Sequence, residues 1–194
     1  MSKIYCMMGK SSTGKDTLYK RILANKELQL KTVIPYTTRP IREGEKEGVE
    51  YFFCNSEKVA ELESAGKVIE RRDYNTVHGI WTYFTVDDGQ IDLENHDYLI
   101  IGTLESYHKI RDYYGKEFVV PIYIEVEDGE RLQRALNRER EQTVPKYEEM
   151  CRRFLADAKD FSEENLNVSE ITRRFVNRDL DEAESDIAAY IKSF

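Results

Sequence analysis

A phosphate-binding loop is the sequence feature with the most specific chemistry. Residues 9–17 read Gly-Lys-Ser-Ser-Thr-Gly-Lys-Asp-Thr, follow an apolar run at 4–8 and precede a helical pattern, as the G-x-x-x-x-G-K-[ST] motif requires. In such a loop the glycines let backbone N–H groups converge on phosphate oxygens, and the helix N-terminus adds a positive field. The lysine carries a full charge to the β- and γ-phosphates of a nucleotide. The predicted loop residues are Gly9, Ser11, Ser12, Thr13, Gly14, Lys15, Asp16 and Thr17.

The last position of the motif holds Asp16, where a serine or threonine hydroxyl normally binds Mg²⁺. A carboxylate is also a good hard-oxygen ligand for Mg²⁺, and Thr17 supplies a hydroxyl beside it. Asp16 can equally be a first-turn helix residue whose charge favours the helix dipole. Asp16 and Thr17 are therefore the candidate metal ligands, and both interpretations of Asp16 stay open.

A second cluster is suited to binding an anion. Arg39 and Arg42 are three residues apart, and Tyr51 follows nine residues later. Guanidinium groups give forked, charge-assisted contacts to phosphate, and a phenol adds one more donor. The alternative is a pair of exposed arginines balanced by neighbouring glutamates, an arrangement that contributes little to stability.

Alternating strands and helices must position these residues, and such alternation predicts an α/β fold with a P-loop parallel sheet core flanked by helices. Apolar runs predict strands at 4–8, 32–34, 51–54, 68–69, 98–101, 119–124 and 175–176. Helices are expected from about residue 14, at 57–65, 104–114, 129–140 and 146–161, and from residue 179.

Two stretches interrupt the alternation. Residues 36–86 hold several short strands and predict a mixed-β substrate-binding flap, and the charged segment 138–153 predicts a small helical lid. The chain is expected to be a single domain, 1–194, whose core consists of residues 1–35, 87–137 and 154–194.

The composition limits the class of protein. The chain has 194 residues with 37 acidic and 29 basic side chains, a net charge of −8, which disfavours coating of nucleic acid or anionic membrane. Its three cysteines have no metal-ligand spacing and suit a reducing compartment. No apolar run approaches the roughly 18 residues of a membrane span, and the N-terminus has no signal-peptide pattern. We expect a cytoplasmic protein with no nucleic-acid or membrane partner, and the oligomeric state is left open.

The motifs together resemble those of the guanylate kinase family, P-loop enzymes that move a phosphoryl group from ATP to GMP. The resemblance spans nearly the whole chain. It rests on the phosphate loop, on T-T-R-x-x-R-x-G-E-x-x-G-x-x-Y-x-F at 37–53, on Val-Ile-Glu at 68–70 and on Phe-Val-Asn-Arg-Asp-Leu-Asp-Glu-Ala at 175–183.

The resemblance implies ATP and Mg²⁺ as cofactors and GMP as the acceptor. Arg39, Arg42 and Tyr51 would hold the GMP phosphate, and Glu70 would accept hydrogen bonds from the guanine N1–H and amino group. The catalytic set it implies is Lys15, Arg39, Arg138 and Arg153, of which the last two would close over the transferring phosphates. Arg131, Arg134 and Arg138 share one helix face, a pattern that a solvated helix also shows.

Three positions depart from the family pattern. Pro35-Tyr36 stand where a serine normally precedes the two threonines, and His78-Gly79-Ile80 replace a Tyr-Gly-Ser/Thr. The usual D-x-D appears as Ile-Ile-Gly-Thr at 100–103, with Thr103 and Glu105 as possible substitutes. His78, Gly79 and Thr103 are candidate substrate contacts, although an isolated histidine is more often structural. GMP is the expected acceptor, with guanine selectivity open.

Two other functions compete with GMP phosphorylation. One is a kinase for a small phosphate such as ribose 1,5-bisphosphate, whose phosphate loop also tends to end in G-K-D. The other is a non-catalytic guanylate-kinase-like module that binds a protein partner. The flap motif disfavours the first, and the intact Gly9, Gly14, Lys15 and Thr17 disfavour the second.

Overall fold

The centre of the protein is a five-stranded parallel sheet in the order β2-β7-β1-β8-β9. The structure of the protein is a computed structural model, and it describes residues 1–76 and 79–194. The strands are β1 (Ile4–Met8), β2 (Lys31–Thr32), β7 (Tyr98–Ile101), β8 (Val119–Glu125) and β9 (Arg174–Val176).

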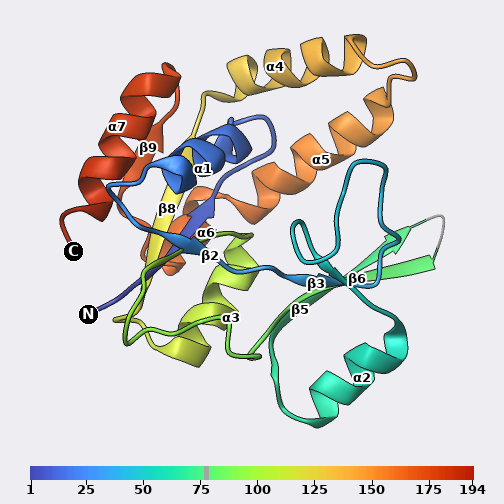
Figure 1. Cartoon of the computed structure of the whole chain (residues 1–194). Helices are drawn as coiled ribbons and strands as arrows, with labels where there is room; N and C mark the ends of the chain where they lie inside the picture. Colours follow the sequence, from blue (N-terminus) through green and yellow to red (C-terminus); the bar gives the residue numbers. More distant parts are fainter. Residues whose placement is uncertain (77–78) are drawn as a thin grey trace.

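Helices cover both faces of this sheet because β1 sends alternate apolar side chains to opposite sides. Tyr5 and Met7 pack in one cluster with side chains of α1 (Lys15–Ala24) and α7 (Leu180–Ile191). The alternate side chains Ile4, Cys6 and Met8 pack in a second cluster, to which α3 (Leu104–Tyr114) and α6 (Glu163–Val168) contribute. Figure 1 shows the two layers with the sheet between them.

A four-stranded mixed sheet projects to one side of the parallel sheet (Figure 1). Its order is β4-β3-β6-β5, and its long β5–β6 hairpin is antiparallel. Helix α2 packs on it through a small separate core that includes Val59, Leu62 and Phe84. The elements are β3 (Tyr36–Thr37), β4 (Phe52–Phe53), α2 (Ser56–Ser64), β5 (Val68–Thr76) and β6 (Gly79–Val86).

Two long helices complete the fold. Helix α4 (Asp128–Arg140) and helix α5 (Tyr147–Asp160) run beside each other above the parallel sheet, joined by a short connection (Figure 1). Their facing side chains include the pair Arg131 and Phe154, whose guanidinium carbon and ring centroid lie 4.1 Å apart. The pair of helices places several arginines above the first loop of the chain.

The predicted α/β class, with a helix-flanked parallel sheet and a mixed sheet, is confirmed. Strands 4–8 and 98–101 and helix 104–114 have the predicted bounds. The hairpin was underpredicted: β5 continues to Thr76 and β6 was not identified, and neither was the short helix α6. The division of the chain into core, flap and lid stays a prediction. Within residues 1–76 and 79–194, no helix is both long and apolar enough to cross a bilayer.

Candidate active site

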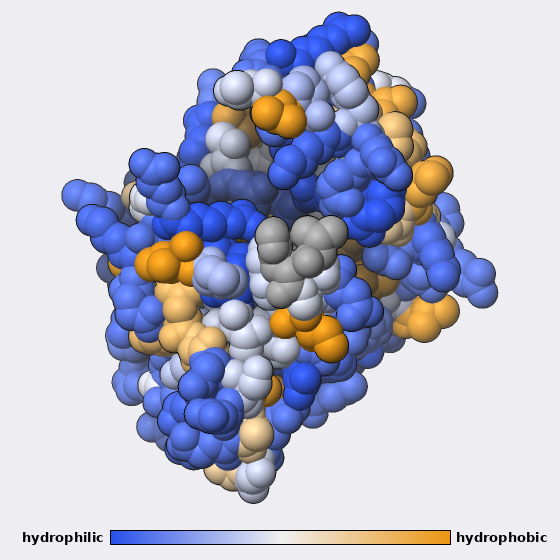
Figure 2. Space-filling model, turned by 90° about the vertical axis from the view of Figure 1, so that its right-hand side faces the viewer, coloured by the Kyte–Doolittle hydropathy of each residue, from blue (hydrophilic) through white to orange (hydrophobic). Residues whose placement is uncertain are grey.

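A cavity of about 840 Å³ lies where the carboxyl ends of the parallel strands face the mixed sheet. The first loop, the end of β7, the hairpin and helix α5 all contribute to its wall. Figure 2 shows a hollow surrounded mostly by hydrophilic residues, with apolar side chains in small separate groups. This is the edge of an open α/β sheet at which ligands are generally bound.

Gly14 gives the predicted phosphate loop its shape. It is the residue that precedes α1 and has a φ of +81°, a left-handed conformation that L side chains rarely adopt. The buried Asn177 side chain donates a hydrogen bond from Nδ2 to the Thr13 carbonyl at 2.7 Å, and the Thr13 hydroxyl donates to the Lys10 carbonyl at 2.9 Å. The loop is therefore held from both sides at the amino end of a helix, where backbone N–H groups remain available to an anion.

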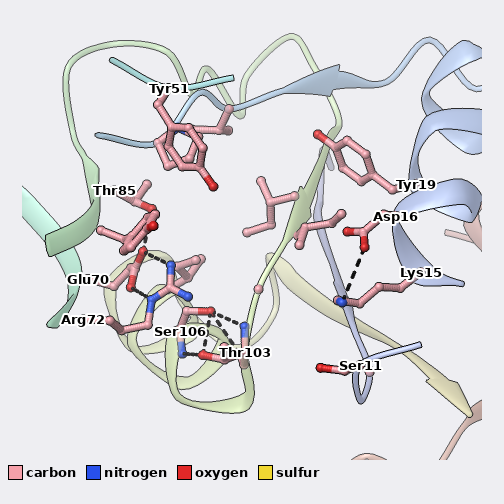
Figure 3. Close-up of a pocket in the computed structure, with 18 of the residues that line it drawn as sticks. Ser11, Lys15, Asp16, Tyr19, Tyr51, Glu70, Arg72, Thr85, Thr103 and Ser106 are labelled. Carbon is pink, nitrogen blue, oxygen red and sulfur yellow. Dashed lines mark hydrogen bonds and ion pairs between the residues drawn. The ribbon is translucent and has the colours of Figure 1, made fainter. Parts of the chain in front are cut away.

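The two candidate metal ligands are placed differently. Asp16 lines the cavity, and its side chain is 75% exposed, with Oδ2 3.8 Å from the Lys15 Nζ (Figure 3). Thr17 is exposed as well but is not among the described residues that line the cavity. Of the pair, Asp16 is the residue that lines the cavity.

Both predicted lid arginines reach the loop. Arg138 donates from Nη2 to the Ser12 hydroxyl at 3.3 Å, and Arg153 donates from Nη2 to the Ser11 hydroxyl at 3.1 Å. They come from α4 and α5 respectively, so two separate helices bring positive charge to one loop. The arrangement can neutralise negative charge that develops at this position.

An ion-pair network around the buried Arg131 was not identified from the sequence. Arg131 is 1% exposed, donates from Nη1 to the Ser11 carbonyl at 3.2 Å and pairs with Asp128 and Asp157. Asp157 in turn accepts a hydrogen bond from the Ser11 backbone N–H at 2.7 Å. The shared helix face was the only signal for Arg131, and nothing in the sequence relates Asp157 to the loop. The network fixes the loop relative to α4 and α5.

Arg39 and Arg42, the two arginines of the motif at residues 37–53, are in contrasting environments. Arg39 is 3% exposed and binds the Glu45 carboxylate in a forked contact, with both N–O distances at 2.8 Å. Its guanidinium lies 5.1 Å from the Tyr51 ring centroid. Arg42 is exposed, and its backbone N–H also donates to Glu45. Of these residues, Tyr51 is the one that lines the cavity.

Glu45 completes the flap motif as a counter-ion. The hydrogen bonds from Arg39 lower the pKa of its carboxyl group from 4.5 to about 2, and the Arg42 backbone N–H adds to that effect. Glu45 orders the turn that carries Arg42, because its carboxylate accepts hydrogen bonds from the Arg39 guanidinium and from the Arg42 backbone N–H.

Glu70 lies at the opposite end of the cavity, in β5, and is covered by Arg72 (Figure 3). Its carboxylate accepts hydrogen bonds from Arg72 Nε at 2.9 Å, from Arg72 Nη2 at 3.2 Å and from the Thr85 hydroxyl at 2.9 Å. The Glu70 side chain is 1% exposed and the Arg72 side chain 18% exposed. Of this ion pair, the Arg72 guanidinium is therefore the group more accessible from the cavity.

The remaining predicted contacts have local explanations. Thr103 lines the cavity, but its hydroxyl caps α3 by accepting a hydrogen bond from the Ser106 N–H at 3.2 Å. The Cβ of a side chain at Gly102 would lie 2.5 Å from the Ser106 hydroxyl, so that hydroxyl would have to move to admit an aspartate. Gly79 begins β6 at the end of the hairpin and is not among the described residues lining the cavity. His78 lies outside the described residues.

Comparison with known proteins gives the family. The family model described as guanylate kinase matches residues 1–194, the full length of the chain. The chain belongs to the guanylate kinase family. It is accordingly a kinase, an enzyme that transfers a phosphoryl group.

Individual guanylate kinases are similar over most of their length. The guanylate kinase of Methylobacillus flagellatus is 26% identical over 193 residues, which cover 98% of this chain and 88% of that protein. The guanylate kinase of Malacoplasma penetrans is 26% identical over 160 residues, 81% of this chain and 79% of that protein. The crystal structure of guanylate kinase from Anaplasma phagocytophilum has the same fold, with a TM-score of 0.67 at 20% identity over 99% of this chain and 85% of that one.

Proposed function

We propose that this kinase transfers the γ-phosphoryl group of ATP to the phosphate of GMP, giving ADP and GDP. The observation that carries the proposal is one continuous cavity, which joins the phosphate loop with Lys15 to the flap side chains Tyr51 and Glu70. Membership of the guanylate kinase family supports GMP as the acceptor.

The loop would bind the ATP phosphates, with Lys15 at the β- and γ-phosphates. The chemistry of the donors fits a magnesium ion, because the exposed Asp16 carboxylate faces the cavity. Among the described residues there is no cluster of three or more His, Cys, Asp or Glu side chains able to hold a metal by themselves. Asp16, with Thr17 as its neighbour, would therefore share the ion with nucleotide oxygens and water. When bound, Mg²⁺ would neutralise negative charge on the nucleotide phosphates.

The flap would hold the acceptor phosphate through Arg39, Arg42 and Tyr51. Arg39 contacts Tyr51 but is buried and paired with Glu45, so it would have to become exposed to reach an anion, whereas the Arg42 side chain is already exposed. Closing of the flap over the cavity would bring these donors to one phosphate and exclude water from the reacting groups.

Phosphoryl transfer requires little covalent chemistry from the protein. An oxygen of the GMP phosphate attacks the γ-phosphorus, the bond from that phosphorus to the β–γ bridging oxygen breaks, and ADP leaves with the electron pair. The attacking oxygen is already anionic, so no strong general base is needed. Lys15, Arg138 and Arg153 would stabilise the charge that spreads over the transferring group.

The two competing functions are less well supported. A ribose 1,5-bisphosphate kinase agrees with Asp16, but aromatic side chains of the flap (Tyr51, Tyr74, Trp81 and Tyr83) line the cavity and suit a flat base. A non-catalytic binding module has no need for lysine and arginines converging on one loop.

The direct test is ADP release from Mg·ATP with GMP, dGMP, AMP, CMP, UMP and ribose 1,5-bisphosphate, each at the same concentration, with a no-acceptor control. Strong release with GMP is expected. Release with the ribose compound and not with GMP would establish the small-phosphate kinase. No ADP release with any acceptor, despite measurable ATP binding, would establish a binding module.

A further inference from the structure

We propose that Arg72, rather than Glu70, reads the base, by donating hydrogen bonds to the O6 and N7 edge of a 6-oxopurine. Glu70 would then serve as a positioning residue that holds Arg72. The expected consequence is a kinase that accepts IMP as well as GMP. This inference rests on the proposed function, since it concerns the acceptor of the same reaction.

The first observation is that Glu70 has little capacity left for a ligand. A carboxylate offers about four lone-pair sites. Arg72 and the Thr85 hydroxyl take three of them: Oε1 accepts from Arg72 Nη2 and from Thr85, and Oε2 accepts from Arg72 Nε. To accept two donors of guanine side by side, the carboxylate would have to give up its bonds with Arg72. It would also have to become exposed, because only 1% of its side chain is accessible.

The second observation is that Arg72 faces the cavity with donors to spare. A guanidinium has five N–H donors; two of those of Arg72 go to Glu70, and the Tyr74 side chain is a further hydrogen-bond partner, which leaves two donors for a ligand. Arg72 is opposite Tyr83 in the β5–β6 pairing, and both side chains line the cavity. Burial alone would lower the pKa of Arg72, but the neighbouring Glu70 carboxylate outweighs burial and holds that pKa above its usual value. The guanidinium is thus a fixed, charged donor in the position shown in Figure 3.

The chemistry of the purine edges selects the ligand. O6 and N7 of guanine are both acceptors, and a guanidinium binds them in a forked contact. Hypoxanthine presents the same two acceptors, adenine replaces O6 by an amino donor, and pyrimidines have no N7. The 2-amino group that distinguishes guanine from hypoxanthine lies on the other edge. Glu50, a flap carboxylate that also lines the cavity, already accepts a hydrogen bond from the Lys46 backbone N–H at 2.7 Å.

Substrate analogues test the inference on the unaltered enzyme. kcat/KM is measured with GMP, IMP and 7-deaza-GMP at fixed Mg·ATP. IMP is expected within about tenfold of GMP, and 7-deaza-GMP, which has lost N7, is expected to fall by roughly 5- to 150-fold, the usual discrimination of a forked guanidinium contact.

The opposite order of rates with IMP and 7-deaza-GMP would overturn the role proposed for Arg72. A base read by Glu70 through N1–H and the amino group would make IMP poor and leave 7-deaza-GMP equal to GMP. A loss with IMP of more than tenfold, or a loss with 7-deaza-GMP of less than fivefold, overturns the assignment to Arg72 while the GMP kinase activity stands. Inactivity with all three overturns the proposed function itself.

A variant pair separates recognition from folding. Arg72→Met uncovers Glu70, so the preference for GMP over IMP should rise and the penalty for 7-deaza-GMP should disappear. A purely structural Arg72 would instead lower kcat/KM for all three substrates by the same factor. The matched control is Arg71→Met, which removes a neighbouring arginine of β5 that pairs with Glu63 and Asp73 and is not among the described residues lining the cavity. If Arg72→Met does not fold, the analogue measurements decide alone.

Discussion

Replacing Gly14 by alanine should destabilise the protein through a single close contact in the phosphate loop. The φ of +81° at this position costs an alanine about 1–2 kcal/mol. The added Cβ would lie 2.5 Å from Asn177 Nδ2, so the amide must move away. The move breaks its 2.7 Å hydrogen bond with the buried Thr13 carbonyl, which costs about 1–3 kcal/mol more. The two effects together predict a loss of about 2–5 kcal/mol in the free energy of unfolding.

The chain provides a matched control for the backbone part of this effect. Gly66 has a similar φ of +66°, and nothing lies within 4 Å of the Cβ that an alanine would add. Gly66→Ala should therefore lose only the conformational cost of about 1–2 kcal/mol. In an Asn177→Ala background, which removes the contact, Gly14→Ala should cost the same as Gly66→Ala.

Urea denaturation, monitored by circular dichroism, measures the stability of both glycine variants in the wild-type and in the Asn177→Ala backgrounds. The m value should stay constant across the variants, so that midpoint shifts report stability. Equal losses for Gly14→Ala and Gly66→Ala in the wild-type background would refute the role assigned to Asn177. A persisting difference between them in the Asn177→Ala background would refute it as well.

Three further predictions concern charges at the site. Lys15→Ala should lower kcat by at least roughly a hundredfold, the scale on which one positioned charge or donor acts on a transition state; near-normal turnover in steady-state assays would contradict its role. Arg42→Ala should raise KM for GMP at least about tenfold, a typical loss for a charged hydrogen bond, and leave ATP titrations unchanged; a parallel weakening of ATP would place Arg42 elsewhere. The pKa of Glu45 is lowered from 4.5 to about 2 by Arg39, so its contribution to stability is present above pH 4.5 and lost as the pH falls towards 2. The stability difference between wild type and Glu45→Gln should therefore shrink over that range in urea titrations, and a constant difference would refute the coupling.

Much of the fold and of the loop could be predicted because the signals are local. An apolar run, glycines at fixed spacing and a following helix lie together within residues 4–24, and the helix at 104–114 has its own cap at Thr103. The hairpin could not be predicted in the same way. β5 carries Glu70, Arg71, Arg72 and Asp73 in succession, and its strand conformation comes from pairing with β6 rather than from apolar alternation.

The contacts of the site also divide into those with a local signal in the sequence and those without one. Glu70 and Arg72 are two residues apart, so a longer predicted strand would have placed both on one face. The predicted strand ended at residue 69, which hid their pairing. Asp157 and Ser11 are 146 residues apart, and only the packing of α5 above the loop brings them together. Contacts of this kind have no signature in one sequence.

Transfer of label from [γ-³²P]ATP, with GMP and Mg²⁺ present, tests the proposed reaction most directly. Label is expected in the β-phosphate of GDP, in equal amount to the ADP formed, and only when GMP is added. Label that appears in inorganic phosphate alone, or that stays in ATP at saturating GMP, would contradict phosphoryl transfer to GMP by this protein.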